Sequence, residues 1–331
     1  MDLWLQKIWY SGSITGWLLV PFGWLYRSAV FFRRWLYRRG WLASAHPGVP
    51  VIVVGNITVG GTGKTPLVLW LVKALRERGF RPGVISRGYG GGTHSESVLV
   101  SAAADARTVG DEPLLIARRS GVPVVVFPDR LAACKRLLAE DVDIIVADDG
   151  LQHYRLERDV EIAVVDGERG LGNKRLLPAG PLREPPSRLA QVDAVVVNGG
   201  AEAAGRITMK LAFGDVRSLD GDEQRPLSGF RGETVHAVAG IGNPGRFFRQ
   251  LEGAGLQIAA HPFPDHASFD AASLAFPDDA PVLMTEKDAV KCPAMNDRRY
   301  WYVPVDAHFS DADTATLLDV VTSRIAARSK Q

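Results

Sequence analysis

The stretch PVIVVGNITVGGTGKTPLVLWLVKAL, residues 50–75, decides the fold. It joins an apolar β-branched strand, a glycine-rich turn and an apolar helix in immediate succession, which is the context of a phosphate-binding P-loop. Glycine amides can approach phosphate oxygens, Lys64 can reach the outer phosphates, and Thr65 can bind Mg²⁺ where the helix begins. The sequence therefore predicts that ATP and Mg²⁺ are held by Thr58, Gly60, Gly61, Thr62, Gly63, Lys64 and Thr65.

Short apolar runs rich in β-branched residues recur along the chain, separated by helical patterns. Such runs are typical of buried parallel strands, and they occupy residues 51–54, 124–127, 143–147, 161–165 and 194–197. We expect an α/β fold in which residues 47–220 form a P-loop NTPase-like core, a mostly parallel sheet with helices on both faces. A polar segment at 215–225 marks a boundary. The strands expected at 235–240, 281–285 and 301–305 predict a smaller C-terminal α/β domain in residues 221–331.

Two acids follow the apolar run at 143–147. A P-loop enzyme needs an acid at the end of a nearby buried strand to hold Mg²⁺, and Asp148 and Asp149 occupy that position. A second carboxylate is needed near an acceptor hydroxyl, but spacing alone does not rank the acids in plausible loops: Asp111, Glu112, Asp166 and Asp265.

Residues 1–46 differ in composition from the rest of the chain. Up to Trp41 they hold six of the eight tryptophans and one acid against six bases, and the 19 residues from Ile8 to Tyr26 carry no charge. Aromatic residues recur every seven positions at 10, 17, 24 and 31, which favours a helix lying in a membrane interface over a spanning one. The alternatives are a helix packed on the protein's own core and a signal peptide cleaved near 43–45. Five intervening arginines argue against cleavage.

A second glycine motif occurs in VAGIGNPGRF, where Gly240, Gly242 and Gly245 match a dinucleotide-binding fingerprint. The acid expected at the end of the next strand is missing, because His261 and Pro262 stand there. We therefore expect a tight turn between a strand and a helix, with a dehydrogenase as the alternative.

The charge and cysteine content exclude other classes of protein. The chain has 39 basic and 37 acidic residues, a balance that does not suggest a nucleic-acid-binding protein. Cys134 and Cys292 are too far apart in sequence for the paired spacing of a zinc site or a disulfide framework.

Four motifs follow the P-loop in order: GDEP at 110–113, DDGLQH at 148–153, LLPAGPLREP at 176–185 and PDH at 264–266. With the Trp-rich N-terminal segment and the unusual VGNITVGGTGKTP loop, the chain resembles the tetraacyldisaccharide 4'-kinases of lipid A biosynthesis over nearly its full length. That family's loop also lacks the first consensus glycine, which here is Thr58. The resemblance implies transfer of the ATP γ-phosphoryl group to the 4'-hydroxyl of a tetraacylated glucosamine disaccharide 1-phosphate. The product would be lipid IVA, formed at the cytoplasmic face of the inner membrane.

The same resemblance implies roles for individual residues. Asp111 would be the base or orienting carboxylate with His266 as its partner, and Lys64 would act on the phosphates. The metal ligands would be Thr65, Asp148, Asp149 and Glu184, and the substrate would meet Glu112, Gln152, His153 and Arg183. Expected partners are the acylated disaccharide lipid and the membrane surface, without nucleic acid or an obligate protein partner.

A membrane-associated P-loop switch ATPase is the remaining alternative. Such proteins carry a lysine just before the paired glycines, and this chain has Val59 there.

Overall fold

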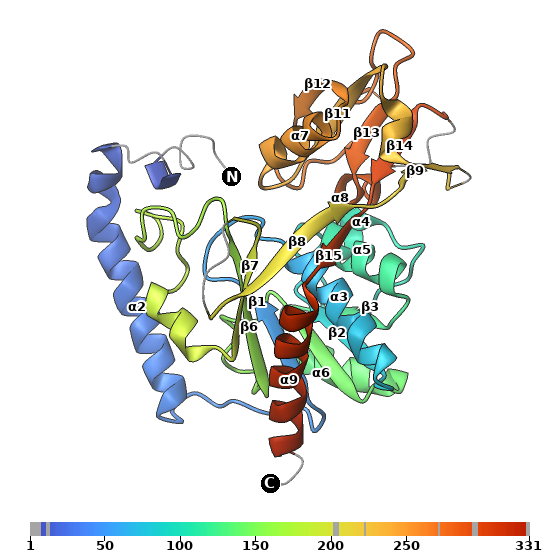
Figure 1. The fold of residues 1–331 in the computed structure, drawn as a ribbon. Coiled ribbons are helices and arrows are strands. Elements are labelled where there is room, and N and C mark those ends of the chain that lie inside the picture. Colours follow the sequence, from blue (N-terminus) through green and yellow to red (C-terminus); the bar gives the residue numbers. More distant parts are fainter. Residues whose placement is uncertain are drawn as a thin grey trace.

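The computed structural model describes residues 8–10, 14–200, 205–221, 223–270, 272–292 and 297–328, and its strands form two sheets (Figure 1). The large sheet has nine strands in the order β15 (Val305–His308), β8 (Ile207–Phe213), β7 (Ala194–Asn198), β6 (Val160–Asp166), β1 (Val51–Gly55), β5 (Ile144–Asp148), β2 (Pro82–Ser86), β4 (Val124–Val126) and β3 (Val98–Leu99). Its strands run parallel except the two edges, β15 and β3.

The small sheet has six strands in the order β10 (Gln224–Arg225), β9 (Val216–Ser218), β14 (Tyr300–Val303), β13 (Val282–Thr285), β11 (Thr234–Ala239) and β12 (Gln257–Pro262). The α-helices are α2 (Val20–Arg38), α3 (Lys64–Glu77), α4 (Ala106–Val109), α5 (Asp111–Ser120), α6 (Arg130–Leu137), α7 (Pro244–Gly253), α8 (Glu286–Ala289) and α9 (Asp311–Arg328). The 3-10 helices of the described residues are η1 (Ile14–Leu19), η2 (Leu138–Glu140), η3 (Pro186–Gln191) and η4 (Leu227–Phe230). The mostly parallel α/β fold predicted from the sequence is confirmed.

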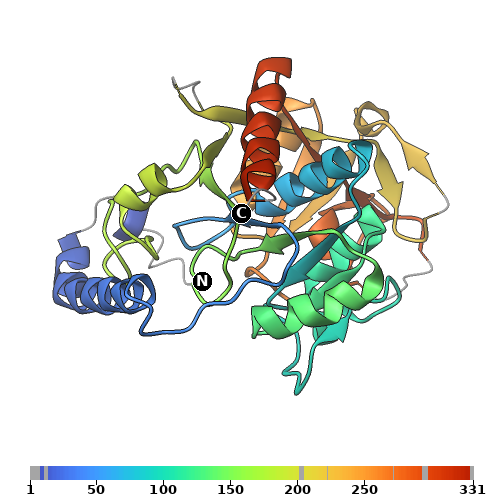
Figure 2. The same ribbon diagram turned by 90° about the horizontal axis from the view of Figure 1, so that it is seen from below.

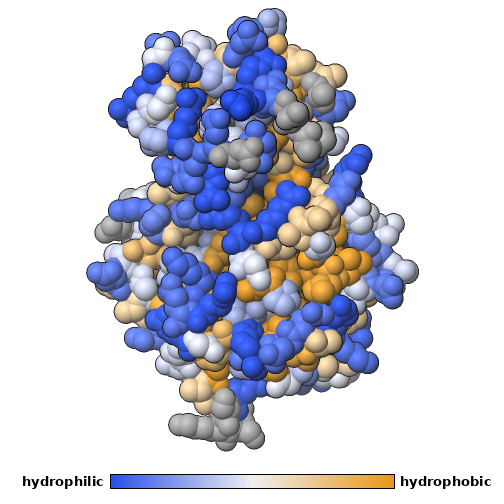
Figure 3. Space-filling view, turned by 90° about the vertical axis from the view of Figure 1, so that its right-hand side faces the viewer, coloured by the Kyte–Doolittle hydropathy of each residue, from blue (hydrophilic) through white to orange (hydrophobic). Residues whose placement is uncertain are grey.

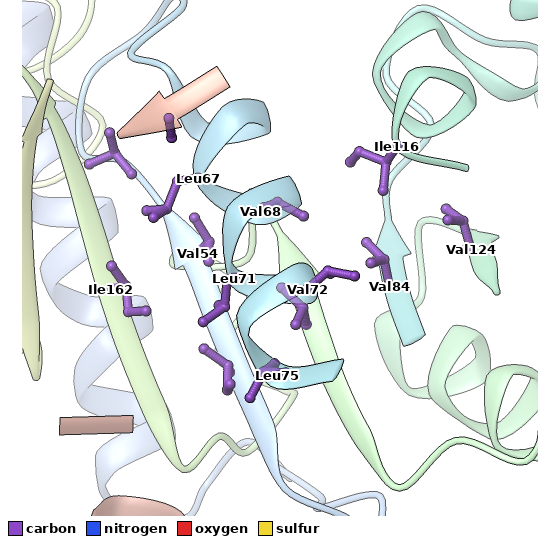
Figure 4. Packing of buried hydrophobic residues seen from close by; sticks show 14 of the residues in the cluster. Val54, Leu67, Val68, Leu71, Val72, Leu75, Val84, Ile116, Val124 and Ile162 are labelled. Atoms are coloured by element: carbon purple, nitrogen blue, oxygen red, sulfur yellow. The ribbon is translucent and has the colours of Figure 1, made fainter. Parts of the chain in front are cut away.

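The central strand β1 is buried on both faces because helices cover both sides of the large sheet. Alternate side chains of a strand point to opposite faces. Ile52 and Val54 accordingly join the apolar cluster under α3, α5 and α9, and Val51 and Val53 join the cluster under α6. Figure 4 shows α3 laying an apolar stripe, from Leu67 to Leu75, across the first of these faces. Burial on two sides explains why the strand has no polar residue.

The chain crosses between the two sheets at Pro304. The sequence analysis expected one strand over 301–305, and this was wrong: β14 ends at Val303 in the small sheet, and β15 begins at Val305 in the large one. Proline cannot donate a hydrogen bond to a neighbouring strand, so it suits a break between two strands. The chain after Pro304, including α9, packs on the large sheet. The predicted domain boundary at residue 220 stays a prediction. The small sheet begins a few residues before it, at Val216, and ends at Val303, well before the predicted end of the second domain at residue 331.

Hereafter the part built on the small sheet, residues 216–303, is called the small lobe, and the remainder, the large lobe. Figure 3 shows that hydrophobic residues gather on one face of the large lobe, while hydrophilic residues predominate on the small lobe above it.

Helix α2 lies along one side of the large lobe, far from α3 and α5, in both ribbon views (Figure 2). Gly23 is its buried residue, Tyr26 packs against the apolar cluster under α6, and Arg34 and Arg38 donate hydrogen bonds to Gln191. Five large apolar side chains of α2 and two just before it are exposed to solvent: Phe22, Trp24, Leu25, Phe31 and Phe32, and Trp17 and Leu18. This arrangement does not favour the alternative of a helix buried against the protein's own core. Parts of the predicted N-terminal segment, residues 1–7 and 11–13, lie outside the described residues.

Within the described residues, none of the helices combines the length and apolarity that crossing a membrane would need.

Candidate active site

The P-loop leaves the carboxyl end of β1 and enters α3. Gly60 and Gly63 have φ angles of 103° and 93°, in the left-handed region that favours glycine. Gly63 has no room for a side chain, because a Cβ atom there would collide with the amide nitrogen of Asn198. That amide donates to the carbonyl of Thr62 at 3.0 Å, so it supports the loop from the end of β7.

A second segment supports the loop from the other side. The amide of Val59 donates to the carbonyl of Pro181 at 2.8 Å, and the amide of Arg183 donates to that of Ile57 at 2.7 Å. Thr58 lies between these bonds in an antiparallel bridge with Leu182, and it is buried. A residue held in extended pairing needs no glycine, which explains how this loop departs from the consensus.

Asp148 and Asp149 stand at the end of β5, beside the P-loop, because β5 pairs in parallel with β1. Their environments are opposite. Burial and then the charge of Glu112 raise the pKa of Asp148 to about 7, and neither of its oxygens has a hydrogen-bond partner among the described residues. Asp149 is only half-buried: desolvation would raise its pKa, but Lys64 at 3.5 Å and Arg183 at 2.9 Å outweigh this and hold the pKa below the ordinary value.

The unpaired carboxylate of Asp148 fits a cation-binding role. Within the described residues, no group of three or more His, Cys, Asp or Glu side chains is arranged to enclose a metal ion. Mg²⁺ commonly binds one or two carboxylates together with substrate phosphates, and Asp148 and the hydroxyl of Thr65 are the protein groups that could hold it in this way. Glu184 is less suited, because its two oxygens already accept hydrogen bonds from Tyr154 and Gln152.

The two lobes meet at Asp111 and His266. Asp111 begins α5 in the large lobe, and His266 follows β12 in the small lobe with a φ of 62°, which is strained for a residue other than glycine. Nδ1 of His266 lies 2.9 Å from Oδ2 of Asp111. Burial opposes ionisation of Asp111, but this hydrogen bond and the charge of Lys287 overcome it and lower its pKa.

Lys287, from α8 of the small lobe, lies among three carboxylates. Its Nζ atom is 2.8 Å from Glu112, 3.5 Å from Asp265 and 3.9 Å from Asp111. Burial alone would favour the neutral amine, but Glu112 and the other two acids raise the pKa of Lys287 above its ordinary value. The lysine therefore stays charged.

Two cavities meet beside these groups. One, of about 200 Å³, is lined by the P-loop from Gly61 to Thr65, by Lys287, and by apolar side chains of both lobes such as Phe213 and Phe247. The other, of about 360 Å³, is lined by Asp148, Asp149, Gln152, Arg183 and Glu184, and by Tyr26, Val30 and Arg33 of α2. Glu112 lines both cavities, so the two sites are neighbours.

Three of the four predicted substrate residues, Glu112, Gln152 and Arg183, line the second cavity. His153 is not among its lining residues. Its backbone amide closes a turn onto Gly150, and Nε2 is buried without a hydrogen-bond partner in the described structure. Burial and then Arg130 lower the pKa of His153 to about 4, so the ring is neutral near pH 7. Its predicted contact with substrate stays a prediction that this placement does not favour.

Three residues that line the first cavity were not predicted from the sequence: Lys287, Asn198 and Arg246. Arg246 donates to Asn198 at 3.1 Å and so continues the support of the P-loop into the small lobe. Asn198 ends a predicted strand at the sheet edge that carries the P-loop, a position that could have identified it. No comparable local signal marks Lys287.

The second glycine motif forms the turn between β11 and α7, as expected. Gly242 abuts the P-loop: a Cβ atom there would lie 2.7 Å from the amide nitrogen of Gly61. Glycine is needed where two backbones approach this closely. The motif therefore brings the small lobe against the phosphate loop and lines the first cavity with Ile241 and Asn243.

Comparison with known proteins agrees with this geometry. The profile of the family LpxK, tetraacyldisaccharide-1-P 4'-kinase, matches residues 15–323. A tetraacyldisaccharide 4'-kinase of Nitrosococcus oceani is 50% identical over 318 residues, covering 96% of this chain and 94% of the relative. That of Alkalilimnicola ehrlichii is 53% identical over 289 residues, covering 87% of each. The crystal structure of LpxK from Aquifex aeolicus in complex with ATP superimposes with a TM-score of 0.79 at 29% identity, covering 94% of this chain and 99% of that one.

Proposed function

The chain belongs to the family of tetraacyldisaccharide-1-phosphate 4'-kinases, and from this membership we infer that it transfers the γ-phosphoryl group of ATP to the 4'-hydroxyl of tetraacyldisaccharide 1-phosphate. The product is lipid IVA, an intermediate of lipid A biosynthesis. The match covers the whole P-loop core and the small lobe, so it includes the P-loop and the motifs that carry Asp111, Asp148 and His266.

The observation that carries this function is the position of Glu112 in the walls of both cavities. We assign the cavity that holds the P-loop to ATP and the cavity bordered by α2 to the sugar that accepts the phosphate. Asp111, the residue before Glu112, pairs with His266 next to this position, and these two side chains line a separate cavity of about 770 Å³. Phosphoryl transfer depends mainly on positioning and on charge stabilisation, and this arrangement supports both.

In the proposed reaction, Asp111 orients the 4'-hydroxyl and accepts its proton as the new oxygen–phosphorus bond forms. The bond between the β- and γ-phosphates breaks, and ADP leaves. Nδ1–H of His266 donates a hydrogen bond to the Asp111 carboxylate and so fixes its direction. The low pKa of Asp111 keeps it ionised at neutral pH, ready to accept a hydrogen bond from the hydroxyl.

The phosphate groups meet Lys64 and the amides of the P-loop. Lys64 lies 3.5 Å from Asp149 in the described structure, so the carboxylate holds the ammonium group at the mouth of the loop. Mg²⁺, when bound, supplies positive charge to the transferring phosphate. Thr65 and Asp148 would hold it, with Asp149 positioned to orient Lys64 and Arg183.

Helix α2 supports a location at the cytoplasmic face of the inner membrane. Successive helical residues are about 100° apart, so Trp24 and Phe31 share one side of α2, while Tyr26, Val30 and Arg33 share the opposite side. The first side is exposed, with 67% of Trp24 and 69% of Phe31 accessible to solvent, and the second lines the acceptor cavity. A helix lying in the interface would thus deliver a lipid headgroup to the site while its acyl chains stay in the bilayer.

The function is tested with γ-labelled ATP, Mg²⁺ and tetraacyldisaccharide 1-phosphate dispersed in detergent. Wild type is expected to place label in the lipid. Lys64→Ala loses phosphate contacts and Asp111→Ala loses the acceptor carboxylate, so both should transfer little label. Wild-type protein that hydrolyses ATP and leaves the lipid unlabelled would instead indicate a switch ATPase.

A further inference from the structure

Two ion pairs join the small lobe to α5 of the large lobe. Arg119 pairs with Glu286 at 2.6 Å, and Glu112 pairs with Lys287 at 2.8 Å. Residues 112 and 119 are seven positions apart, about two helical turns, so they lie on the same side of α5. Their partners are consecutive residues of the short helix α8, which begins where Thr285 accepts a hydrogen bond from the amide of Asp288. Helix α8 therefore contacts α5 near both ends of α5.

The two pairs have different surroundings. The Arg119 pair, which also includes Asp306, lies at the end of α5 far from His266. The Lys287 pair lies where Asp111 begins the helix, and its ammonium group also faces Asp265, the residue before His266. Lys287 thus contacts both segments that carry the pair: Asp111 itself on α5, and Asp265 next to His266 in the small lobe.

Removing the charge of Lys287 would leave three carboxylates facing one another: Asp111, Glu112 and Asp265. Like charges within a few ångströms in a partly buried site repel strongly. Of the other basic side chains nearby, His266 already contacts Asp111 at 2.9 Å and Asp265 at 3.7 Å, and Lys64 pairs with Asp149 at 3.5 Å. Lys291, whose charge also acts on Asp111, pairs with Asp288 at 2.6 Å. The ATP phosphates would add negative charge to the same place.

We propose that Lys287 is a positioning residue for phosphoryl transfer: it bridges Glu112 and Asp265 and thereby holds the Asp111–His266 pair beside Glu112, the residue that lines both cavities. The inference rests on the proposed 4'-kinase function. It concerns the geometry of the pair, because a displacement of about 1 Å at a reacting centre can lower the rate about a hundredfold.

The test compares Lys287→Met with Lys287→Arg and with the matched control Arg119→Met, which removes the other ion pair between α5 and α8. Steady-state kcat and the KM for ATP are measured with saturating lipid, and thermal unfolding is followed for each variant. Lys287→Met is expected to lower kcat about a hundredfold with little change in KM. Lys287→Arg, which keeps the charge, should lie closer to wild type, and Arg119→Met should change kcat less than threefold.

Two results would overturn the proposal. Either Lys287→Met retains kcat within threefold of wild type, or Arg119→Met loses as much kcat as Lys287→Met, which would make docking of α8 the cause. If Lys287→Met is unfolded at the assay temperature, Lys287→Arg decides the question instead. The proposal then stands if kcat of Lys287→Arg is more than one tenth of kcat of Arg119→Met, and it fails otherwise. If wild type fails to label lipid, the proposed function fails first, and the two failures are distinguishable.

Discussion

Replacing Asp148 with asparagine should stabilise the nucleotide-free protein at alkaline pH. The carboxyl group is buried, both its oxygens lack hydrogen-bond partners among the described residues, and Glu112 lies close enough to repel it. These causes raise the pKa of Asp148 from 3.8 to about 7. Without a bound cation, the ionised carboxylate of Asp148 therefore lowers the free energy of unfolding.

The direction of the pH effect follows from this shift. Below pH 3.8 the group is neutral in the folded and unfolded chain alike, so there is no penalty. Between pH 3.8 and about 7 the unfolded chain ionises first, and the free energy of unfolding falls as pH rises. Above that range the full penalty applies. A shift of about three pKa units corresponds to about 4 kcal/mol.

Asparagine removes this penalty but leaves an amide without partners, which costs about 1 to 3 kcal/mol. The net gain for Asp148→Asn at pH 8 is therefore about 1 to 3 kcal/mol. At pH 5 the penalty in wild type is only about 2 kcal/mol, so the gain should nearly disappear. Urea unfolding in EDTA, without nucleotide, at both pH values measures the difference.

Asp149→Asn is the matched control, because Lys64 and Arg183 lower the pKa of that carboxyl. Its replacement should destabilise the protein at pH 8. The reasoning is refuted if Asp148→Asn is less stable than wild type at pH 8, or if its effect is the same at pH 5.

Three further changes test other parts of the structure. Gly63→Ala should lower the free energy of unfolding by about 1 to 3 kcal/mol, because its φ of 93° is strained for alanine; an unchanged urea midpoint would contradict this. His266→Gln should lower kcat about a hundredfold while the Kd for ATP, measured by calorimetry, stays the same; an equal loss of ATP binding would contradict its role beside Asp111. Trp24→Ser combined with Phe31→Ser should weaken sedimentation with anionic phospholipid vesicles more than a hundredfold, for a loss of about 3 kcal/mol; undiminished binding would exclude α2 as the membrane contact.

The fold was predictable where the evidence is local. The P-loop occupies a single continuous stretch, and strands buried on both faces have an unmistakable composition, as β1 shows. The break at Pro304 was also visible in the sequence, but the apolar residues on its two sides suggested one strand. Only the pairing of β15 with β8 shows that these residues belong to different sheets.

The site was predictable only in part, because its residues come from distant segments. Asp111 and His266 are 155 positions apart, and family motifs, rather than spacing, suggested the pair. Lys287 belongs to none of the sequence motifs, and its position depends on how the small lobe packs on α5. For Glu184, the sequence showed an acid in a motif but could not show that Tyr154 and Gln152 occupy its oxygens.

The most direct test of the central claim is the position and stoichiometry of the transferred phosphate. After incubation with ATP, Mg²⁺ and tetraacyldisaccharide 1-phosphate, phosphorus NMR of the purified lipid locates the new monoester, and released ADP is counted in the same reaction. We predict a second phosphate on the 4'-oxygen and one ADP for each lipid phosphorylated. ADP formed without a new lipid phosphate, or a phosphate at another hydroxyl, would contradict the account.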